Sequence, residues 1–565
     1  MSRQGRDPRF GPPAGLGKRR GHDRRDSVGP PDHRPAASGA AGDGGAARAP
    51  LSWHWVKRDP SRSETVRRND VRSIVFRAVI GTLGLLGLLG STSLPVVAAP
   101  VNSPDYAAID SYVSNSLAGT PGFALSIVHG DQVTHVKGFG IANSAGVPMT
   151  ADTPLVIGSQ AKSFTALAIM QLSESRALSL DSPVQDYLPW FRVAQNDFSQ
   201  QITIRQLLNQ TSGLPPSAPF DTAVTTVESR VRDLASVNLT APPGQLWQYS
   251  NSNYDVLGQV VATVSGQTYG DYMRDHVFRP LAMTHTFASE AEAQANGLGE
   301  GHQWWFGLPV SSDTYRQDYV PAGFLVSSAN DMSHFLIAQL NGGTYNGQSV
   351  VSAQGVTAMH AGVVKVGTGG SYGMGWLADT LNRTPVVSHD GDSLNMHTDM
   401  ILVPTHGWGV EIIANSDSLP ILLGASVGTT VKGVISMLMG WSVPPTPAPI
   451  AIYTVFDLLV LALIAFQLWS LIRALQQQPN VKPGSSLLLR RIALPMGWRL
   501  VAAALPLGLL LILGSSLGAP ISVIATTDIG LSGIAIAALL LVNGAVRAVV
   551  AGTAMRSRTQ VVTGP

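Results

Sequence analysis

The chain contains no cysteine, and only 13% of its 565 residues are charged. Without cysteine it can form no disulfide, no cysteine metal site and no thiol nucleophile. Its histidines lack His-Glu-x-x-His or similar ligand spacing, so we expect neither a metal nor a cofactor. The charged fraction is far below the roughly 25% of soluble domains. This deficit indicates membrane-spanning segments in a chain too long for one ordinary domain.

The N-terminal region, residues 1–72, has no sustained hydrophobic period and is rich in Gly, Pro, Ala and Arg. This composition predicts disorder. Its basic clusters fit a nucleic-acid-binding arm or the cytoplasmic flank of a membrane segment, and the second explanation is simpler, so we expect no nucleic-acid partner. The apolar run at 73–99 predicts a cleaved signal peptide or a signal-anchor helix. Both alternatives export the residues that follow.

Residues 104–438 have the length and composition of a soluble body with a large core. Tyr106 to Leu117 is predicted to be helical, and 123–140 is predicted to form two strands joined by a Gly-Asp turn. Further strands are expected near 385–388, 398–404 and 408–414. Strands at both ends of a helical middle predict an α+β fold whose sheet joins the two ends of the domain.

A Pro-rich linker at 439–449 leads into a strongly apolar region, 450–551. Three candidate transmembrane helices lie at about 450–472, 499–518 and 529–551, each near the ~20 residues that a bilayer requires. The loop between the first two spans is basic (Arg473, Lys482, Arg490, Arg491 and Arg499), and the tail at 552–565 carries Arg556 and Arg558.

Basic loops stay on the cytoplasmic side of a membrane. The charge distribution therefore predicts a multi-pass protein of the cell membrane, with a cytoplasmic tail and an extracytoplasmic body. The N-terminal apolar run predicts the same topology. Asp457 lies inside the first span, where a charge is costly; it is either functional or, as we expect, placed near the outer interface or paired within the bundle.

Within the body, Ser159 and Lys162 begin a largely apolar helix three residues apart, so both side chains lie on one face. Unpaired N–H groups at a helix start favour developing negative charge. A partly desolvated lysine can act as base toward a serine hydroxyl. Ser-x-x-Lys also occurs by chance on solvated helices, so this pair alone decides nothing.

Two further elements bear candidate site residues. Tyr249 and Asn251 follow a Pro/Gly-initiated turn that can aim both into a cleft, where a phenol relays a proton and an amide binds a carbonyl or the lysine. Taken alone, this is more commonly an ordinary aromatic turn. His389, Gly391 and Asp392 end an expected edge strand, where Gly391 would admit a ligand and Asp392 would supply an oxyanion N–H beside that of Ser159.

Together these elements resemble the serine β-lactamase and penicillin-binding-protein superfamily, and especially its class C β-lactamase-like branch of carboxypeptidases, D-aminopeptidases and esterases. The resemblance covers about residues 104–438. For example, ITIRQLLNQTSGLP at 202–215 is similar to the family segment ITIRHLLTHTSGLP. The resemblance implies a β-lactamase/transpeptidase-like antiparallel sheet flanked by helices, with an additional all-helical domain.

The resemblance also implies roles for individual residues. Ser159 would be the acylated nucleophile and Lys162 its base, with Tyr249 assisting proton transfer and Asn251 orienting the substrate and the lysine. His389-Asp-Gly stands where classical members have Lys-Thr-Gly, a departure shared by many esterases and peptidase-like members. Because histidine binds a substrate carboxylate less securely at neutral pH, efficient β-lactam hydrolysis is not expected.

The sequence therefore predicts a membrane-anchored, extracytoplasmic serine hydrolase that acts on small-molecule or peptide substrates through an acyl-enzyme. D-amino-acid peptides and small esters are the leading substrate classes. A penicillin- or cell-wall-fragment-binding sensor or scaffold with little turnover is the alternative, and a β-lactamase is a lesser one. The sequence makes no prediction of oligomeric state.

Overall fold

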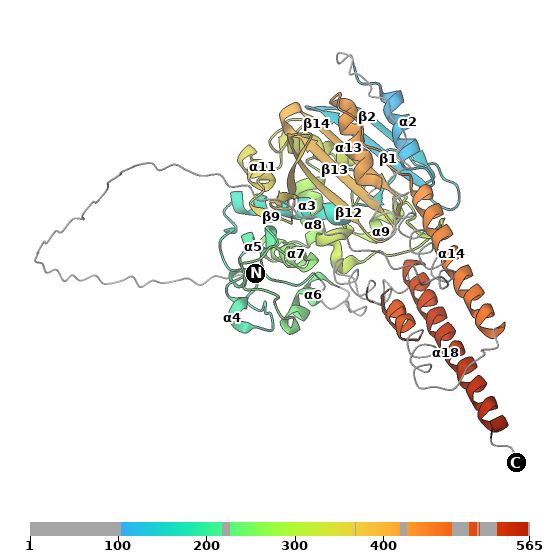
Figure 1. Cartoon of the computed structure of the whole chain (residues 1–565). Helices are drawn as coiled ribbons and strands as arrows, with labels where there is room; N and C mark the ends of the chain where they lie inside the picture. Colours follow the sequence, from blue (N-terminus) through green and yellow to red (C-terminus); the bar gives the residue numbers. More distant parts are fainter. Residues whose placement is uncertain are drawn as a thin grey trace, which may run out of the picture. The chain divides into compact units, whose positions relative to one another are not determined.

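Eight antiparallel strands form one sheet (Figure 1). They are β1 (Gly122–His129), β2 (Gln132–Gly140), β9 (Val364–Val366), β10 (Gly369–Tyr372), β11 (Leu377–Leu381), β12 (Thr384–Asp392), β13 (His397–Val403) and β14 (Trp408–Ala414). The strand order is β2-β1-β14-β13-β12-β11-β10-β9. Phe123 of β1 pairs with Ala414 of β14, so the sheet joins the two ends of the body, as the sequence predicted.

The computed structural model describes residues 103–216, 226–367, 369–417, 426–476, 496–505, 508 and 528–562, and the structural statements below concern these residues. The predicted disordered region (1–72), the predicted signal segment (73–99) and most of the second candidate span (499–518) lie outside them. The proposed domain boundaries therefore remain predictions.

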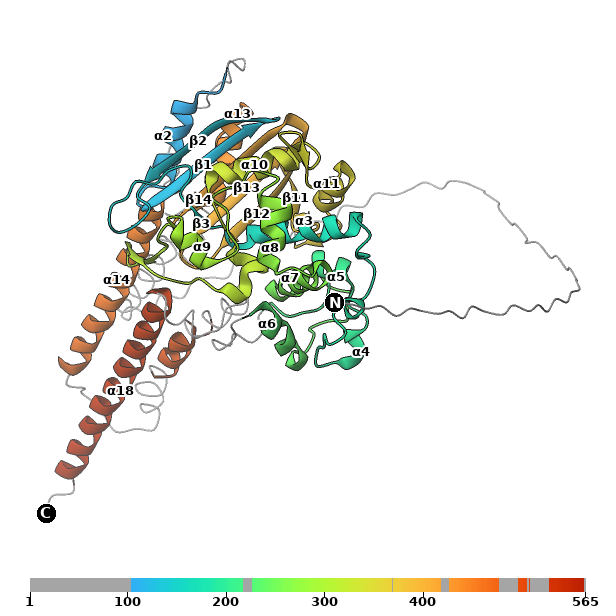
Figure 2. The same cartoon turned by 180° about the vertical axis from the view of Figure 1, so that it is seen from behind.

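Helices cover both faces of the sheet. One face packs against α2 (Tyr106–Ser116) and α13 (Ser426–Leu438), and the other against α3 (Ala161–Glu174) and α10 (Ala329–Leu340), which Figure 2 shows from behind. Because both faces are covered, β1 is buried along nearly its whole length. The result is an α+β body with two hydrophobic layers, one on each side of the sheet.

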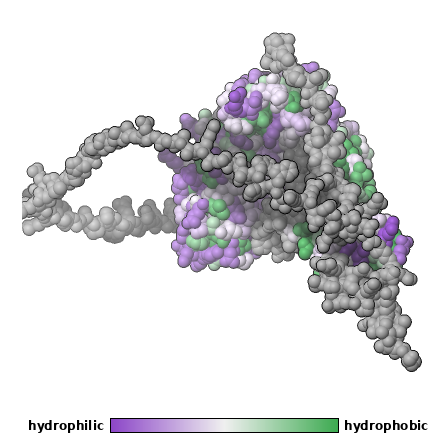
Figure 3. Space-filling view, in the orientation of Figure 1, coloured by the Kyte–Doolittle hydropathy of each residue, from purple (hydrophilic) through white to green (hydrophobic). Residues whose placement is uncertain are grey.

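A helical region and three small sheets complete the body. Its helices are α4 (Asn196–Ser199), α5 (Ile204–Leu208), α6 (Val227–Asp233), α7 (Asn251–Ser265), α8 (Tyr269–Met273), α9 (Glu290–Ala295) and α11 (Ala353–His360). Its strands are β3 (Leu155–Val156) with β6 (Val326–Ser327), β4 (His302–Trp305) with β5 (Leu308–Ser311) and β15 (Ser416–Asp417), and β7 (Thr344–Tyr345) with β8 (Gln348–Ser349). On the face drawn in Figure 3, hydrophilic and hydrophobic residues are interspersed, as on an ordinary protein surface.

Two described helices beyond the body are long and apolar enough to cross a membrane. They are α14 (Pro449–Gln476) and the first part of α18 (Asp528–Val562), and they correspond to the first and third candidate spans. A short apolar helix, Met496–Leu505, covers only the beginning of the second candidate span. Two of the three predicted spans thus coincide with long apolar helices, and the second span remains a prediction.

Candidate active site

The predicted nucleophile, Ser159, lies in a single 3-10 turn, η1 (Gly158–Gln160), and α3 begins immediately afterwards at Ala161. The helix therefore starts two residues later than the sequence predicted. Ser159 is partly exposed, whereas Lys162, on the first turn of α3, is completely buried. The hydroxyl faces solvent and the amine lies beneath it.

Three oxygen atoms surround the buried Lys162 amine. Its Nζ lies 2.9 Å from Ser159 Oγ, 2.8 Å from Asn251 Oδ1 and 2.5 Å from the backbone carbonyl oxygen of Ala322. Burial lowers the pKa of Lys162 to about 7, while the nearby carboxylates of Asp255 and Asp390 act in the opposite direction. A substantial fraction of the amine is therefore neutral at physiological pH and has a lone pair for the serine proton.

The Tyr249 phenol completes this group. It is hydrogen-bonded to the Ser159 side chain, and its ring centroid lies 4.8 Å from Lys162 Nζ. Burial, the largest cause, raises the pKa of Tyr249 well above its usual value, although the bond to Ser159 opposes this. The phenol thus stays protonated at neutral pH and can donate as well as accept a hydrogen bond.

The loop that carries Tyr249 is held by Gln210, which adopts a left-handed backbone with φ of 61°. The Ser250 N–H donates to Gln210 Oε1 over 2.9 Å, and the Ser250 hydroxyl donates to the carbonyl of Pro215 over 2.7 Å. These bonds fix the residue immediately before α7, so Asn251 enters the site as the first residue of that helix. The segment 202–215 therefore positions the predicted Tyr-x-Asn element.

The end of β12 lies against the nucleophile's turn. β12 pairs with β11 only as far as Ser388. From His389 to Asp392 it is therefore paired on one side only, with β13. A Cβ added to Gly391 would lie 2.1 Å from the carbonyl oxygen of Ile157, and one added to Gly158 would lie 2.4 Å from the backbone N of Asp392. Gly391 therefore permits a close approach to the protein's own turn, and its role in admitting a ligand remains a prediction.

The predicted substrate-binding His389 is only 4% exposed. Its Nε2 lies 3.2 Å from the Tyr372 hydroxyl and its Nδ1 lies 2.6 Å from the backbone carbonyl oxygen of Asp390. Burial lowers the pKa of His389, with the Asp390 carboxylate opposing that shift. The imidazole is therefore neutral at pH 7 and offers a substrate no positive charge.

The side chain of Asp392 is hydrogen-bonded to the loop that follows β12. Its carboxylate accepts a hydrogen bond from the Leu394 N–H over 2.6 Å. Burial and the nearby Asp417 carboxylate raise the pKa of Asp392 well above its usual value. The backbone N of Asp392 lies beside Gly158. This is the atom that the sequence predicts to help bind an oxyanion.

Sequence reasoning did not identify Tyr372, which is 3% exposed and meets the Tyr249 ring edge-to-face at a centroid distance of 6.4 Å. Tyr372 therefore connects Tyr249, the predicted proton relay, to His389, which its hydroxyl contacts. The Gly-rich stretch around it, GGSYGMGW at 369–376, was the available signal, because an aromatic residue among glycines often marks close backbone packing. The Ala322 carbonyl and the Asp255 carboxylate were also missed.

A second unpredicted contact lies behind the nucleophile. The Gln160 side-chain amide donates to Glu411 Oε2 over 3.1 Å and to the His389 carbonyl over 3.3 Å. Glu411 is completely buried in β14, and burial raises its pKa well above the usual value. The Glu411 carboxyl group and the Gln160 amide thereby connect the Ser159 turn to the sheet.

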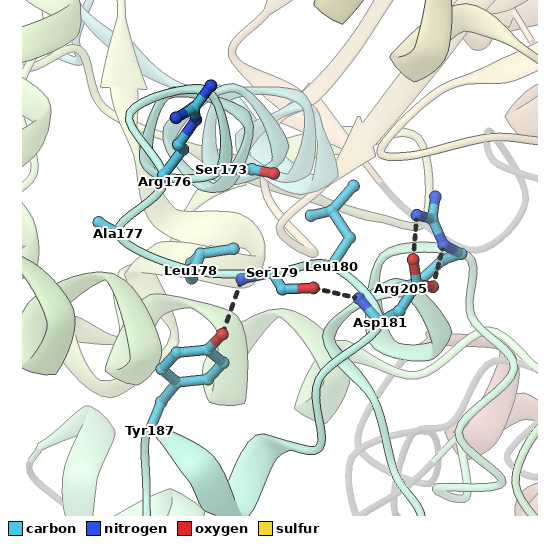
Figure 4. A pocket seen from close by; sticks show the side chains of 9 residues that line it. All are labelled: Ser173, Arg176, Ala177, Leu178, Ser179, Leu180, Asp181, Tyr187 and Arg205. Carbon is cyan, nitrogen blue, oxygen red and sulfur yellow. Dashed lines mark hydrogen bonds and ion pairs between the residues drawn. The ribbon is translucent and has the colours of Figure 1, made fainter. Parts of the chain in front are cut away.

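Two observations concern other parts of the described chain. No group of three or more His, Cys, Asp or Glu residues within it is arranged to hold a metal ion. A cavity of about 570 Å³ lies at the opposite end of α3 from Ser159 (Figure 4). Several of its polar groups are paired: Arg205 with Asp181, and the Ser179 N–H with the Tyr187 hydroxyl.

Residues 109–421 match the Beta-lactamase family. The chain is 30% identical over 319 residues to protein flp of Staphylococcus aureus (strain MW2), covering 55% of this chain and 63% of that protein. It is 28% identical over 354 residues to penicillin-binding protein 4 of Amycolatopsis lactamdurans, covering 58% of this chain and 90% of that protein. The chain thus spans less than two thirds of protein flp.

A solved structure, that of the octameric penicillin-binding protein homologue from Pyrococcus abyssi, is also similar. The TM-score is 0.53 at 26% sequence identity, with 61% of this chain and 79% of that chain covered. The antiparallel sheet, its flanking helices and the match over more than half of the sequence agree with one another. The chain therefore belongs to the β-lactamase family of serine hydrolases and penicillin-binding proteins.

Proposed function

We propose that this protein is a membrane-anchored serine hydrolase that cleaves esters or amides through an acyl-enzyme at Ser159. The observation that carries the proposal is the 2.9 Å separation between the Ser159 hydroxyl and the Lys162 amine, whose pKa burial lowers to about 7. A neutral amine at that distance is a competent base for a serine nucleophile.

In the proposed first step, Ser159 Oγ forms a bond to the substrate carbonyl carbon as its proton passes to Lys162 Nζ. The backbone N–H groups of Ser159 and Asp392 would stabilise the oxyanion of the tetrahedral intermediate. The bond to the leaving group then breaks, and the leaving group takes a proton delivered through Tyr249. Water hydrolyses the resulting ester by the reverse path, which restores the Ser159 hydroxyl.

Substrate preference would follow from His389. Because this imidazole is buried and neutral, with both ring nitrogens engaged by Tyr372 and by a backbone carbonyl, it offers little attraction for a free carboxylate. We therefore place small esters and D-amino-acid amides, which carry no free carboxylate at this position, ahead of β-lactams, whose carboxylate the lysine of classical members binds.

An active-site probe tests the acyl-enzyme. The full chain, purified in detergent, should be labelled by a fluorophosphonate, and Ser159→Ala should abolish labelling. Lys162→Ala should slow it greatly, whereas Ser163→Ala, next along α3, should leave the rate within a few-fold of the parent. Labelling that persists in Ser159→Ala would contradict the proposal. Nitrophenyl esters, D-amino-acid amides and a chromogenic cephalosporin would then rank the substrate classes.

The membrane part of the proposal rests on two long apolar helices, α14 and α18, on the predicted span at 499–518 between them, and on the basic loop that follows α14. A third crossing is needed because an even number of spans would leave the C-terminus on the same side as the body. The proposed topology places the hydrolase body outside the cytoplasm and the C-terminus inside. Alkaline phosphatase fused after residue 441 should be active in cells, and green fluorescent protein fused at residue 565 should fluoresce. The opposite pattern would contradict this topology.

A sensor or scaffold is the second candidate, and one contact favours it. Trp304 of the hydrolase body stacks on Tyr453 of α14 at a centroid distance of 5.1 Å, which gives the body a direct mechanical link to a membrane helix. The lifetime of the acyl adduct separates the two functions. Rapid turnover identifies an enzyme, and an adduct that persists for hours and alters the helices identifies a sensor.

A further inference from the structure

The hairpin of β4 and β5 exposes three large apolar side chains at its tip and along β5. Phe306 is 45% exposed, Leu308 68% and Val310 47%. Leu308 and Val310 lie on the same face of the strand because side chains two residues apart point the same way. Single exposed apolar residues are ordinary, but a contiguous group indicates a surface that another apolar phase covers.

This hairpin is attached to both long apolar helices. The Trp304 ring stacks on Tyr453 of α14, and the Tyr453 hydroxyl donates to the Trp304 carbonyl over 3.2 Å. Two residues further along the hairpin, the Phe306 N–H donates to the Asp528 carboxylate at the start of α18 over 3.3 Å. The tip therefore lies where both helices leave the body.

The position of Asp457 fixes the depth of the tip. A Cβ added to Gly307, at the turn of the hairpin, would lie 3.2 Å from Asp457 Oδ2, so the two are at the same level. Large apolar side chains of α14 are exposed repeatedly from Leu458 onward. Residues 458–472, which end before the basic Arg473, span about 22 Å at 1.5 Å per residue, most of the ~30 Å hydrocarbon thickness of a bilayer.

Asp457 therefore marks the outer boundary of the hydrocarbon, and the hairpin tip is level with it. We propose that Phe306, Leu308 and Val310 insert into the outer leaflet of the same bilayer that α14 and α18 cross. Lipid is the occupant because the apolar group continues directly from the start of those helices, where aromatic side chains favour the membrane interface. The inference rests on the proposed membrane anchoring.

Such insertion would give the hydrolase body a second membrane contact besides its helical stalk. The body would then be held in one orientation toward the bilayer, because the hairpin and α14 contact the lipid at separate points. Ser159 would keep a fixed height above the headgroups, a geometry suited to substrates presented at the membrane surface.

The absence of cysteine allows a direct test, since each single-cysteine variant of the full chain carries one label. Leu308→Cys, Leu461→Cys and Val363→Cys are labelled with the environment-sensitive fluorophore NBD and reconstituted into vesicles of phosphatidylcholine and phosphatidylglycerol. Leu461 is 61% exposed on α14 and serves as the lipid reference, and Val363, 57% exposed on the body, serves as the aqueous reference.

The proposal expects the label at 308 to behave like that at 461: blue-shifted emission, quenching by doxyl-labelled lipid and protection from aqueous iodide. The label at 363 should be quenched by iodide alone. If 461 is quenched by lipid but 308 matches 363, hairpin insertion is overturned while anchoring stands. If 461 is also quenched only by iodide, both proposals are wrong. Melting temperatures of the three variants check that each remains folded.

Discussion

Asp255 is buried behind Lys162, one helical turn after Asn251, and its carboxylate raises the pKa of the lysine against the lowering effect of burial. The influence is mutual. Burial raises the pKa of Asp255 to about 7, while the charges of Arg230 and Lys162 oppose that shift. The protonation of the proposed base is therefore coupled to a carboxyl group that forms no part of the Ser-x-x-Lys motif.

Replacing Asp255 by asparagine should move the acid limb of the pH–rate profile to lower pH. The substitution removes a charge that raises the pKa of Lys162, so the pKa falls and the amine remains a free base further into the acid range. The pH dependence of kcat/KM for a nitrophenyl ester measures this. Asp181→Asn, at an exposed carboxylate, is the control that should not move the limb. A shift toward higher pH would refute the coupling.

Gly391→Ala should reduce both activity and thermal stability. Its new methyl group would meet the Ile157 carbonyl oxygen at 2.1 Å and would force β12 away from the nucleophile's turn. We expect kcat to fall by at least tenfold, because the proposed oxyanion N–H groups would separate. At Gly369→Ala, in β10 of the same sheet, the new methyl group meets no atom within 4 Å, so activity and melting temperature should be nearly unchanged. Equal effects of the two substitutions would argue against the role of this contact.

Tyr372→Phe should lower the free energy of unfolding by about 1–3 kcal/mol, because it leaves the buried Nε2 of His389 without its partner. Denaturant titration measures the change. Tyr187→Phe, which removes a hydroxyl on an exposed loop, should have an effect of only about 0.5–1 kcal/mol. An equally small effect at Tyr372 would mean that another group satisfies the imidazole.

Two arginine–aspartate pairs in this chain should differ sharply in their effect on stability. Arg230 and Asp318 are paired at 2.7 Å and almost fully buried, whereas Arg205 and Asp181 are paired at 2.6 Å and largely exposed. Arg230→Met should cost about 3–5 kcal/mol, because Asp318 would keep only the partly exposed Arg316 and the buried carboxylate of Asp255 would lose the guanidinium beside it. Arg205→Met should cost about 1 kcal/mol or less. Similar losses in both variants would contradict this dependence on burial.

The sequence predicted the residues whose relation is local. Ser159 and Lys162 share a helical turn, and Tyr249 and Asn251 share a loop, so their spacing alone carries the geometry. The sheet was also predictable, because hydrophobic strands stand at both ends of the body. That Ser159 and Tyr249 lie in one site was predicted only from the resemblance to a family, because nothing in their spacing places residue 249 beside residue 159.

The features that were missed depend on contacts between distant segments. The Ala322 carbonyl reaches Lys162 from the short helical turn Val320–Phe324 that precedes β6, and Tyr372 reaches His389 from another strand. Every residue has a backbone carbonyl, so the sequence does not indicate which one contacts Lys162. In a sequence, Tyr372 also resembles any other core aromatic residue. Gly391 was correctly expected to permit a close approach, but only coordinates reveal that its neighbour is the protein's own backbone.

The pairing of β1 with β14 also constrains the order of folding. Phe123 cannot find Ala414 until nearly the whole body has been synthesised, and closing so long a loop makes this central pairing slow. If the body is exported as proposed, its sheet is completed only after residue 414 has crossed the membrane, shortly before α14 enters the bilayer. The unfinished chain would present the unpaired edge of β1 until then, so chaperones outside the cytoplasm would be needed to protect that strand.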